Sequence, residues 1–377
     1  MIQQPNEQQR AGRVRWKRTP TPYERFMEEE GIPVVRGIGL NDVRELPLSP
    51  WARLGGRGSY IQLDGTEGVW GMYIVEIPPR SELRPERHVY EEIYYVVEGR
   101  GSTEVWKESA SRRQVFEWQA GSLFAVPVNC WHRLVNAGSS PVLVLAATGA
   151  PALMNIINST RFIFDNPFDF TDRYDDSLGY FTPKTELEPH PLSERAILRS
   201  NLIPDIVNCE LPVDNHRSPG YKWFEPFMAG NHFFGGGGQQ LPFIAEHQTG
   251  RYSKAHAHAS GAVLVCLKGK GYTCTWSTEL GNTSVGSWKG APGQAAGLHS
   301  KRNGDSRSRR RQLVSPTFRR RQGSVSGAGH RRRLLVGEGE AGGRYCLEQC
   351  RPGGRRAQYP VCPRRSLGPR RVQTGAG

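Results

Sequence analysis

Glu86, His88 and Glu92 stand close together in the sequence, and His132 follows further along the chain. Imidazole and carboxylate groups in this combination bind Fe(II) or Mn(II) and leave coordination positions open for a substrate or oxygen. Glu86 and His88 are two residues apart, so they point to the same face of a strand. The alternative is that His88 is a core histidine while Glu86 and Glu91 are solvated rim charges. The four residues taken together favour a metal site.

A second pair of candidate metal ligands, His256 and His258, occurs far along the chain. These histidines are also two residues apart and would share one face of a strand. We therefore predict that both are metal ligands.

The elements that must carry these residues are predicted to be β-strands. From Trp51 onward, short runs of β-branched and aromatic residues are separated by Gly, Pro and Asn, which is typical of an all-β barrel or sandwich. The same pattern of short strand-like runs returns later in the chain, where Gly269 and Gly271 repeat the spacing of Gly99 and Gly101. This predicts an internal repeat of the first β domain.

Shifts in composition divide the chain into five parts. The expected parts are an N-terminal arm with a short helix over 1–50, a first β domain over 51–150, a connector with one or two short helices over 151–225, a partial second β domain over 226–281, and an Arg/Gly-rich disordered tail over 282–377.

The net charge of +14 is located in that tail. From His299 onward, 19 Arg and one Lys stand against one Asp and three Glu, a net of +16. The chain before His299 has 30 basic and 32 acidic residues. The charge of the β domains therefore gives no reason to expect a nucleic-acid partner.

Two further observations concern the compartment. No apolar run reaches membrane-spanning length, and residues 1–10 lack the apolar core of a signal peptide. Seven cysteines at irregular spacing do not predict a disulfide framework. We expect a cytoplasmic protein with no membrane partner.

The first β domain resembles the cupin superfamily, whose first motif is His-x-His, then Glu, then Gly. His88, Glu92 and Gly99 fit this motif without gaps, and Glu86 stands at the first histidine position. The second motif has Asn129 where glycine is usual. The residues that match the second motif are Gly121, Pro127, His132 and Asn136.

The second β domain resembles another cupin module. His256 and His258 match its histidines, and Ala262 stands at the glutamate position. A cupin with this pattern forms a three-histidine site with a later histidine, but the surroundings of His299 and His330 do not resemble the second motif. The resemblance implies two double-stranded β-helix (jelly-roll) barrels, of which the second is incomplete.

This layout is similar to the gentisate and 1-hydroxy-2-naphthoate dioxygenase group of two-domain cupins, or bicupins. That group uses Fe(II) to bind a hydroxylated aromatic acid together with O2 and to cleave the ring. It holds iron on three histidines, whereas this first domain offers two histidines and two glutamates. By resemblance we expect an Fe(II) enzyme, or one using Mn(II), and a homo-oligomer. The alternatives are a non-catalytic ligand-binding bicupin and a metal-dependent isomerase or decarboxylase.

Within the expected enzyme, His88 and His132 are metal ligands. One of Glu86 and Glu92 is the anionic ligand, and the other is a base or an orienting group. Arginines bind carboxylates through two parallel hydrogen bonds. The candidates for pairing a substrate carboxylate are Arg84, Arg87, Arg100 and Arg133.

The Arg-rich tail has three interpretations. It is a nucleic-acid-binding tail, a disordered segment, or an out-of-frame translation of a GC-rich gene. We favour the third, because shifting the codons from about Trp288 by one nucleotide yields glycines, aromatics and close histidines, as in a second cupin motif. An intact-protein mass that matches an unbroken reading frame across residues 281–289 would contradict it.

Overall fold

The computed structural model describes residues 18–336 apart from 67, 110–111, 190–194, 230–241, 254–255, 259–261, 278–293, 300–312, 315–321 and 328–330. For 256–258, 272, 274–277 and the strands beyond residue 293 it describes the backbone alone. Strands predominate, which confirms the predicted all-β class. No helix within the described residues is long and apolar enough to cross a membrane.

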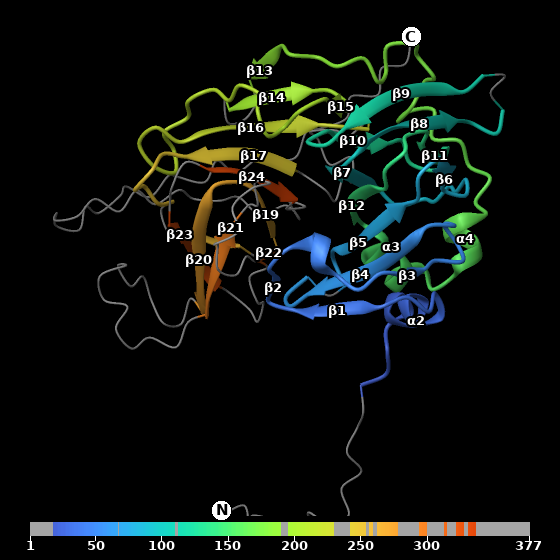
Figure 1. Ribbon diagram of the computed structural model, residues 1–377, viewed down its shortest axis with the longest axis horizontal. Coiled ribbons are helices and arrows are strands. Elements are labelled where there is room, and N and C mark those ends of the chain that lie inside the picture. The colour runs from blue at the N-terminus through green and yellow to red at the C-terminus, as the bar shows by residue number, and fades with distance from the viewer. Residues whose placement is uncertain are drawn as a thin grey trace, which may run out of the picture. The chain divides into compact units, whose positions relative to one another are not determined.

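Two sheets form the first β unit (Figure 1). Their strands are β1 (Val34–Gly37), β4 (Arg57–Leu63), β5 (Gly71–Ile77), β6 (Ser81–Glu82), β7 (Glu92–Glu98), β8 (Arg100–Trp106), β9 (Gln114–Gln119), β10 (Leu123–Val126), β11 (Trp131–Asn136), β12 (Val142–Thr148) and β15 (Leu202–Ile203). The larger sheet has the order β1-β4-β5-β12-β7-β10-β15, and the smaller has the order β6-β11-β8-β9. The short β3 (Ser49–Pro50) pairs with β4 at one side.

Burial patterns explain why the two sheets differ. Strand β12, with sequence VLVLAAT, is buried at every position and pairs with both β5 and β7. Strand β9, with sequence QVFEWQ, alternates buried and exposed residues. The larger sheet is therefore covered at β12 on both faces, whereas the smaller sheet keeps one face toward water.

Two glycines of the first motif have a steric role. Gly99 has φ of +89°, in the left-handed region that side chains disfavour. A Cβ atom on Gly101 would lie 2.3 Å from the carbonyl oxygen of Val135 and 2.4 Å from the Trp118 ring. These glycines let β7 turn into β8 and let β8 lie close against β11 and β9.

Three short helices accompany the first β unit. They are α2 (Pro22–Glu29), α3 (Ala150–Ile157) and α4 (Thr160–Phe164). Helix α2 begins with a capping box at Thr21 and buries Tyr23, Phe26 and Met27. The ring of Phe26 stacks on that of Phe164 with centroids 5.6 Å apart. Both helices thus belong to the aromatic core that surrounds the predicted site.

A second set of strands begins within the predicted connector, at residue 187. The strands are β13 (Leu187–Pro189), β14 (Ala196–Arg199), β16 (Lys222–Phe227), β17 (Pro242–His247), β18 (His256–His258), β19 (Val263–Lys268), β20 (Lys270–Ser277), β21 (Gln294–His299), β22 (Leu313–Val314), β23 (Gln322–Gly327) and β24 (Arg331–Val336). One sheet contains the order β14-β16-β17-β24-β19-β22, which ends on β2 (Gly39–Leu40), and the other has the order β18-β23-β20-β21. This repeats the order of the first unit strand for strand, including a parallel pair at one edge.

Four described strands, β21, β22, β23 and β24, lie beyond residue 281. The sequence predicts a second barrel without closing strands and a disordered tail there, and these domain bounds stay a prediction. Strand β24 pairs with β17 on one side and β19 on the other, in the place that β12 takes between β5 and β7. Backbone pairing supplies the physical reason, because β17 and β19 would otherwise expose unpaired peptide groups.

Candidate metal centre

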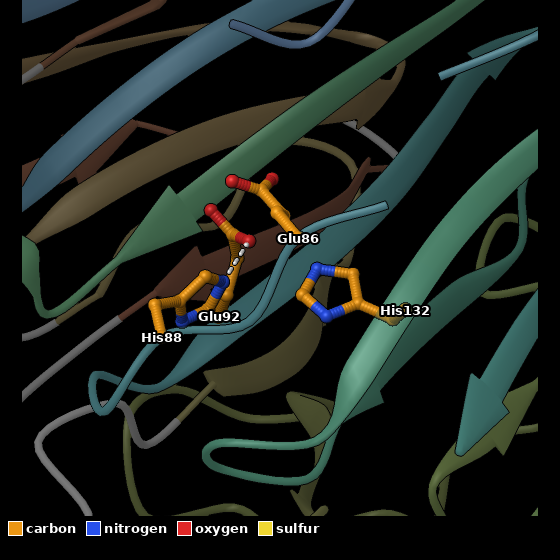
Figure 2. Close-up of side chains that lie close together, drawn as sticks. All are labelled: Glu86, His88, Glu92 and His132. Carbon is orange, nitrogen blue, oxygen red and sulfur yellow. Dashed lines mark hydrogen bonds and ion pairs between the residues drawn. The ribbon is translucent and has the colours of Figure 1, made fainter. Parts of the chain in front are cut away.

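Four side chains that offer metal-ligating atoms converge inside the first β unit. The candidate ligand atoms of Glu86, His88, Glu92 and His132 all lie within 4.8 Å of one another (Figure 2). Glu86 and His132 stand opposite each other in an antiparallel bridge, and each backbone N–H donates to the other residue's carbonyl, at 3.0 and 2.9 Å. Glu92 opens β7, and His132 lies on β11. The structure thus brings together the four residues that the sequence singles out in this domain.

Backbone carbonyls set the orientation of both imidazoles. Nδ1 of His88 is 2.9 Å from the carbonyl oxygen of Tyr90, and Nδ1 of His132 is 3.1 Å from that of Cys130. Since a carbonyl only accepts, each Nδ1 carries the donated proton. In a neutral histidine this leaves the lone pair on Nε2, the arrangement that a metal-ligating histidine requires.

Among the described atoms of this centre, hydrogen-bond acceptors outnumber the protons available to them. Nε2 of His88 lies 3.1 Å from Oε2 of Glu92, and both atoms are acceptors in the neutral tautomer. Oε1 of Glu92 is buried and has no hydrogen-bond partner among the described residues. The Tyr94 hydroxyl donates to Oε2 of Glu92 and also lies 3.1 Å from Nε2 of His132, but it has one proton to give. A bound cation would satisfy this excess, so the residues fit a divalent metal.

The electrostatics agree with that reading. Burial opposes the charged form of His88, but the Glu92 carboxylate attracts the proton strongly enough to raise the pKa of His88. Burial also opposes the charged form of Glu92, and the nearby imidazoles of His88 and His132 lower its pKa. Burial and the neighbouring His88 lower the pKa of His132. The Glu92 carboxylate therefore favours positive charge at this position, which a proton on His88 or a bound cation would supply.

The centre is shielded from water by aromatic rings. The exposed fractions of His88, Glu92 and His132 are 2%, 1% and 1%. The His88 ring stacks on that of Tyr90 with centroids 3.7 Å apart and planes 8° apart. Burial, together with the nearby carboxylates, raises the pKa of Tyr90 and of Tyr94 well above the usual range, which keeps both phenols protonated. Charges at this site interact strongly because so little water screens them.

The arginines proposed to hold a substrate carboxylate do not reach the centre. Arg133 pairs with Glu104 at 3.0 Å, on the opposite face of β11 from His132. The other three are engaged or lie elsewhere: Arg87 pairs with Glu108, Arg84 donates to the carbonyl oxygen of Ala52, and Arg100 lines a surface pocket of about 520 Å³. Among the described residues, Arg53 is the cation that donates to a residue of the centre, Glu86.

Two residues at the centre were absent from the sequence prediction. Tyr94 stands two residues after Glu92 on β7, so strand alternation could have placed it on the same face. Arg53 contacts Glu86 across 33 residues of sequence, and the sequence near Arg53 carries no signal for that contact. His256 and His258 lie on β18, opposite Ser324 and Gln322 of β23, but their side chains lie outside the described part. Their role as ligands stays a prediction.

Comparison with known proteins gives a family match for the first β unit. Residues 73–148 match the family model described as "Cupin domain". A search of curated proteins finds no match. Similar solved structures include a point mutant of Bacillus subtilis oxalate decarboxylase, with 10% identity, TM-score 0.45 and coverage of 80% of this chain and 77% of that chain.

Two other similar structures have different printed names. A salicylate 1,2-dioxygenase from Pseudaminobacter salicylatoxidans has 12% identity, TM-score 0.46 and coverage of 72% of this chain and 71% of that chain. Vicilin from Corylus avellana has 10% identity, TM-score 0.42 and coverage of 79% of this chain and 84% of that chain.

Proposed function

We propose that the first β unit contains a divalent-metal enzyme centre built on Glu86, His88, Glu92 and His132. Residues 73–148 of this unit are a cupin domain, as the sequence predicts. The observation that carries the proposal is the excess of buried acceptor atoms around Glu92. Two imidazoles and a carboxylate form the ligand set of non-haem Fe(II) oxygenases. We infer a dioxygenase that acts on a small hydroxylated aromatic acid, with O2 as co-substrate.

In this proposal the residues of the chain have distinct tasks. His88 and His132 present Nε2 to the metal, because the carbonyl oxygens of Tyr90 and Cys130 hold the protons on Nδ1. Glu92 supplies the anionic ligand. A divalent metal held by these residues would supply Lewis-acid charge and coordination positions for the reactants. The phenol of Tyr94 donates its proton to Oε2 of Glu92.

A second reaction class is favoured by one specific observation. Glu86 adds a second carboxylate to the centre, and oxygen-rich sites suit Mn(II) better than sites rich in histidine. A carboxylate beside a metal also serves as a base in proton transfer. A metal-dependent decarboxylase or isomerase is therefore the alternative, and a bicupin that binds a small ligand without turnover is the non-catalytic one.

Metal analysis followed by assays separates these functions. We expect one Fe or Mn ion per first β unit in the purified full chain, and O2 uptake with gentisate, salicylate or 1-hydroxy-2-naphthoate after anaerobic Fe(II) loading. Release of CO2 without O2 uptake would identify the decarboxylase. Absence of bound Fe, Mn, Ni and Zn, with neither O2 uptake nor CO2 release after loading, would reject the enzyme proposal.

A ligand variant makes the metal assay specific. His88→Ala removes one Nε2 from the centre and is expected to abolish metal binding by the first β unit. His216→Ala is the matched control, because His216 is a half-buried histidine that pairs with Asp214 at 2.8 Å, outside the proposed centre. Metal bound at wild-type stoichiometry by His88→Ala would show that the ligands are assigned wrongly.

A further inference from the structure

Arg53 lies between two carboxylates beside the metal centre. Its Nη1 atom donates to Oε2 of Glu86, and its Nε atom donates to Oε2 of Glu30 at 2.8 Å. The exposed side-chain fractions are 23% for Arg53, 12% for Glu30 and 13% for Glu86. Removing a charged pair from water costs free energy unless its hydrogen bonds are well satisfied. Here one guanidinium satisfies both carboxylates.

Aromatic rings fix the position of the guanidinium. The Arg53 Cζ atom lies 5.6 Å from the ring centroid of Phe26, 5.1 Å from that of Trp51 and 5.4 Å from that of Phe164. Trp51 also donates its indole N–H to Oε2 of Glu30. A planar guanidinium packed in this way has few alternative orientations. The groups that hold Arg53 come from α2, the turn after it, the turn at Trp51 and α4.

Glu86 needs such a partner because of its neighbours. Its carboxylate points toward that of Glu92 (Figure 2), and the two are members of one cluster of ligand atoms. Two negatively charged carboxylates in one cluster repel each other, and burial strengthens the repulsion. Arg53 offsets that repulsion from outside the cluster. The guanidinium also engages one carboxylate oxygen of Glu86, which leaves the other oxygen to act as a ligand.

We propose that Arg53 is a positioning residue, oriented by Glu30, that holds Glu86 as a one-oxygen ligand of the metal centre. This inference rests on the proposed function, because it requires a metal at the cluster. Through Glu30, which follows α2 directly, the N-terminal helix becomes part of the metal-binding unit of the cupin domain.

The test is Mn(II) binding by the full chain, measured by isothermal titration calorimetry. We expect Arg53→Gln to weaken Mn(II) binding about 10–100-fold, as for other residues that orient metal ligands. Glu30→Gln should weaken binding by a smaller factor, since it acts through Arg53. Arg57→Gln is the matched control and should leave binding unchanged, because Arg57 pairs with Glu76 at 3.1 Å and not with a ligand. Circular dichroism checks that each variant is folded.

A double-variant cycle separates positioning of Glu86 from a merely structural role. If Arg53 acts through Glu86, then Arg53→Gln has no further effect on Mn(II) affinity in a Glu86→Gln background. The Mn(II) electron paramagnetic resonance spectrum should change equally in both single variants and no further in the double variant. Additive losses, or wild-type affinity in Arg53→Gln, would overturn the inference.

The design also keeps the two proposals apart. Metal binding that survives Arg53→Gln but is lost in His88→Ala rejects the role of Arg53 alone. Failure of the wild-type chain to bind Mn(II), Fe(II) or Co(II) rejects both proposals. If Arg53→Gln does not fold, Arg53→Lys replaces it, because lysine keeps the charge but lacks the planar pair of donors. Arg53→Lys should then bind Mn(II) more weakly than Arg57→Lys.

Discussion

Tyr94 connects two of the candidate ligands through one hydroxyl. Its proton satisfies Oε2 of Glu92, while its oxygen lies 3.1 Å from Nε2 of His132. The exposed fraction of Tyr94 is 1%, so water is not available to replace the hydroxyl if it is removed. The hydroxyl therefore supports the metal-free state, in which Glu92 has too few donors.

We predict that Tyr94→Phe lowers the free energy of unfolding of the metal-free protein by about 1–3 kcal/mol, the cost of leaving a buried acceptor unsatisfied. Urea unfolding in the presence of a chelator measures this loss. Tyr95→Phe is the matched control, since Tyr95 is the next residue of β7 and points to the opposite face. Equal losses in the two variants would show that the hydroxyl contacts of Tyr94 are not the cause.

Protonation of His88 gives a second residue-scale prediction. The pKa of His88 is raised above its ordinary value of 6.5, chiefly because Glu92 outweighs the effect of burial. The stabilisation from the charged pair is therefore fully present below about pH 6.5 and is lost as the pH rises through the raised pKa. Metal binding requires neutral His88, so it should release more than half a proton at about pH 6.5 and fewer protons at higher pH.

Calorimetry in buffers of different ionisation enthalpy counts these protons. His132 should contribute little, since its pKa is lowered from the ordinary 6.5 and it is already mostly neutral at that pH. A proton release that does not change between about pH 6.5 and about pH 9 would contradict the assignment of His88 as the group displaced by the metal.

The sequence predicted the candidate metal ligands but not the residues that contact them. Imidazole and carboxylate spacing was enough to select Glu86, His88, Glu92 and His132, because metal ligands have a narrow chemistry. It could not supply Arg53 or Glu30, since an ion pair between distant segments depends on how helices and turns pack against the sheet. The substrate arginines were chosen because a guanidinium binds a carboxylate, but strand alternation directs Arg133 away from the centre.

At the scale of elements, Asn136 joins the end of β11 to two turns. Its side-chain amide donates to the carbonyl oxygens of Ile77 at 3.1 Å, Pro78 at 3.0 Å and Ser140 at 2.8 Å. Its Oδ1 atom accepts from the backbone N–H of Gly138 at 3.0 Å. This asparagine of the second motif therefore fixes how the β5–β6 turn meets the β11–β12 turn.

We predict that Asn136→Ala lowers the free energy of unfolding by about 2–4 kcal/mol, because several buried backbone groups lose their partner together. Chemical denaturation measures the change. Asn208→Ala serves as the control, since Asn208 is exposed and its amide pairs with Asp205; it should change stability by less than about 0.5 kcal/mol. A loss under about 1 kcal/mol for Asn136→Ala would show that water replaces these contacts.

Strands were easier to predict than their order. Runs of β-branched and aromatic residues bounded by glycine indicated the all-β class, and the glycine echo indicated the repeat. Pairing order is set by contacts between distant segments, which the texture of one strand does not reveal. Strand β24, with sequence RRRLLV, has no alternation of polar and apolar residues, so periodicity alone gave no reason to expect it.

For the whole molecule, the two β units share one strand order, and the tail supplies part of the second. Strand β24 pairs with Pro242–His247 on one side and with Val263–Lys268 on the other. If residues 282–377 are an out-of-frame translation, β17 and β19 should be stable without them. If the pairing with β24 holds, β17 and β19 should depend on β24. The two views give opposite results for a shortened chain.

We predict that a chain ending at Gly281 loses amide-exchange protection in β17 and β19, because each strand then exposes unpaired peptide groups along a former ladder. A chain ending at Gly339 should keep that protection, since every described strand lies before that residue. Metal binding by Glu86, His88, Glu92 and His132 should survive in both, because none of these four ligands lies beyond His132. Unchanged protection of β17 and β19 in the shorter chain would mean that β24 contributes nothing to the second unit, as the out-of-frame interpretation expects.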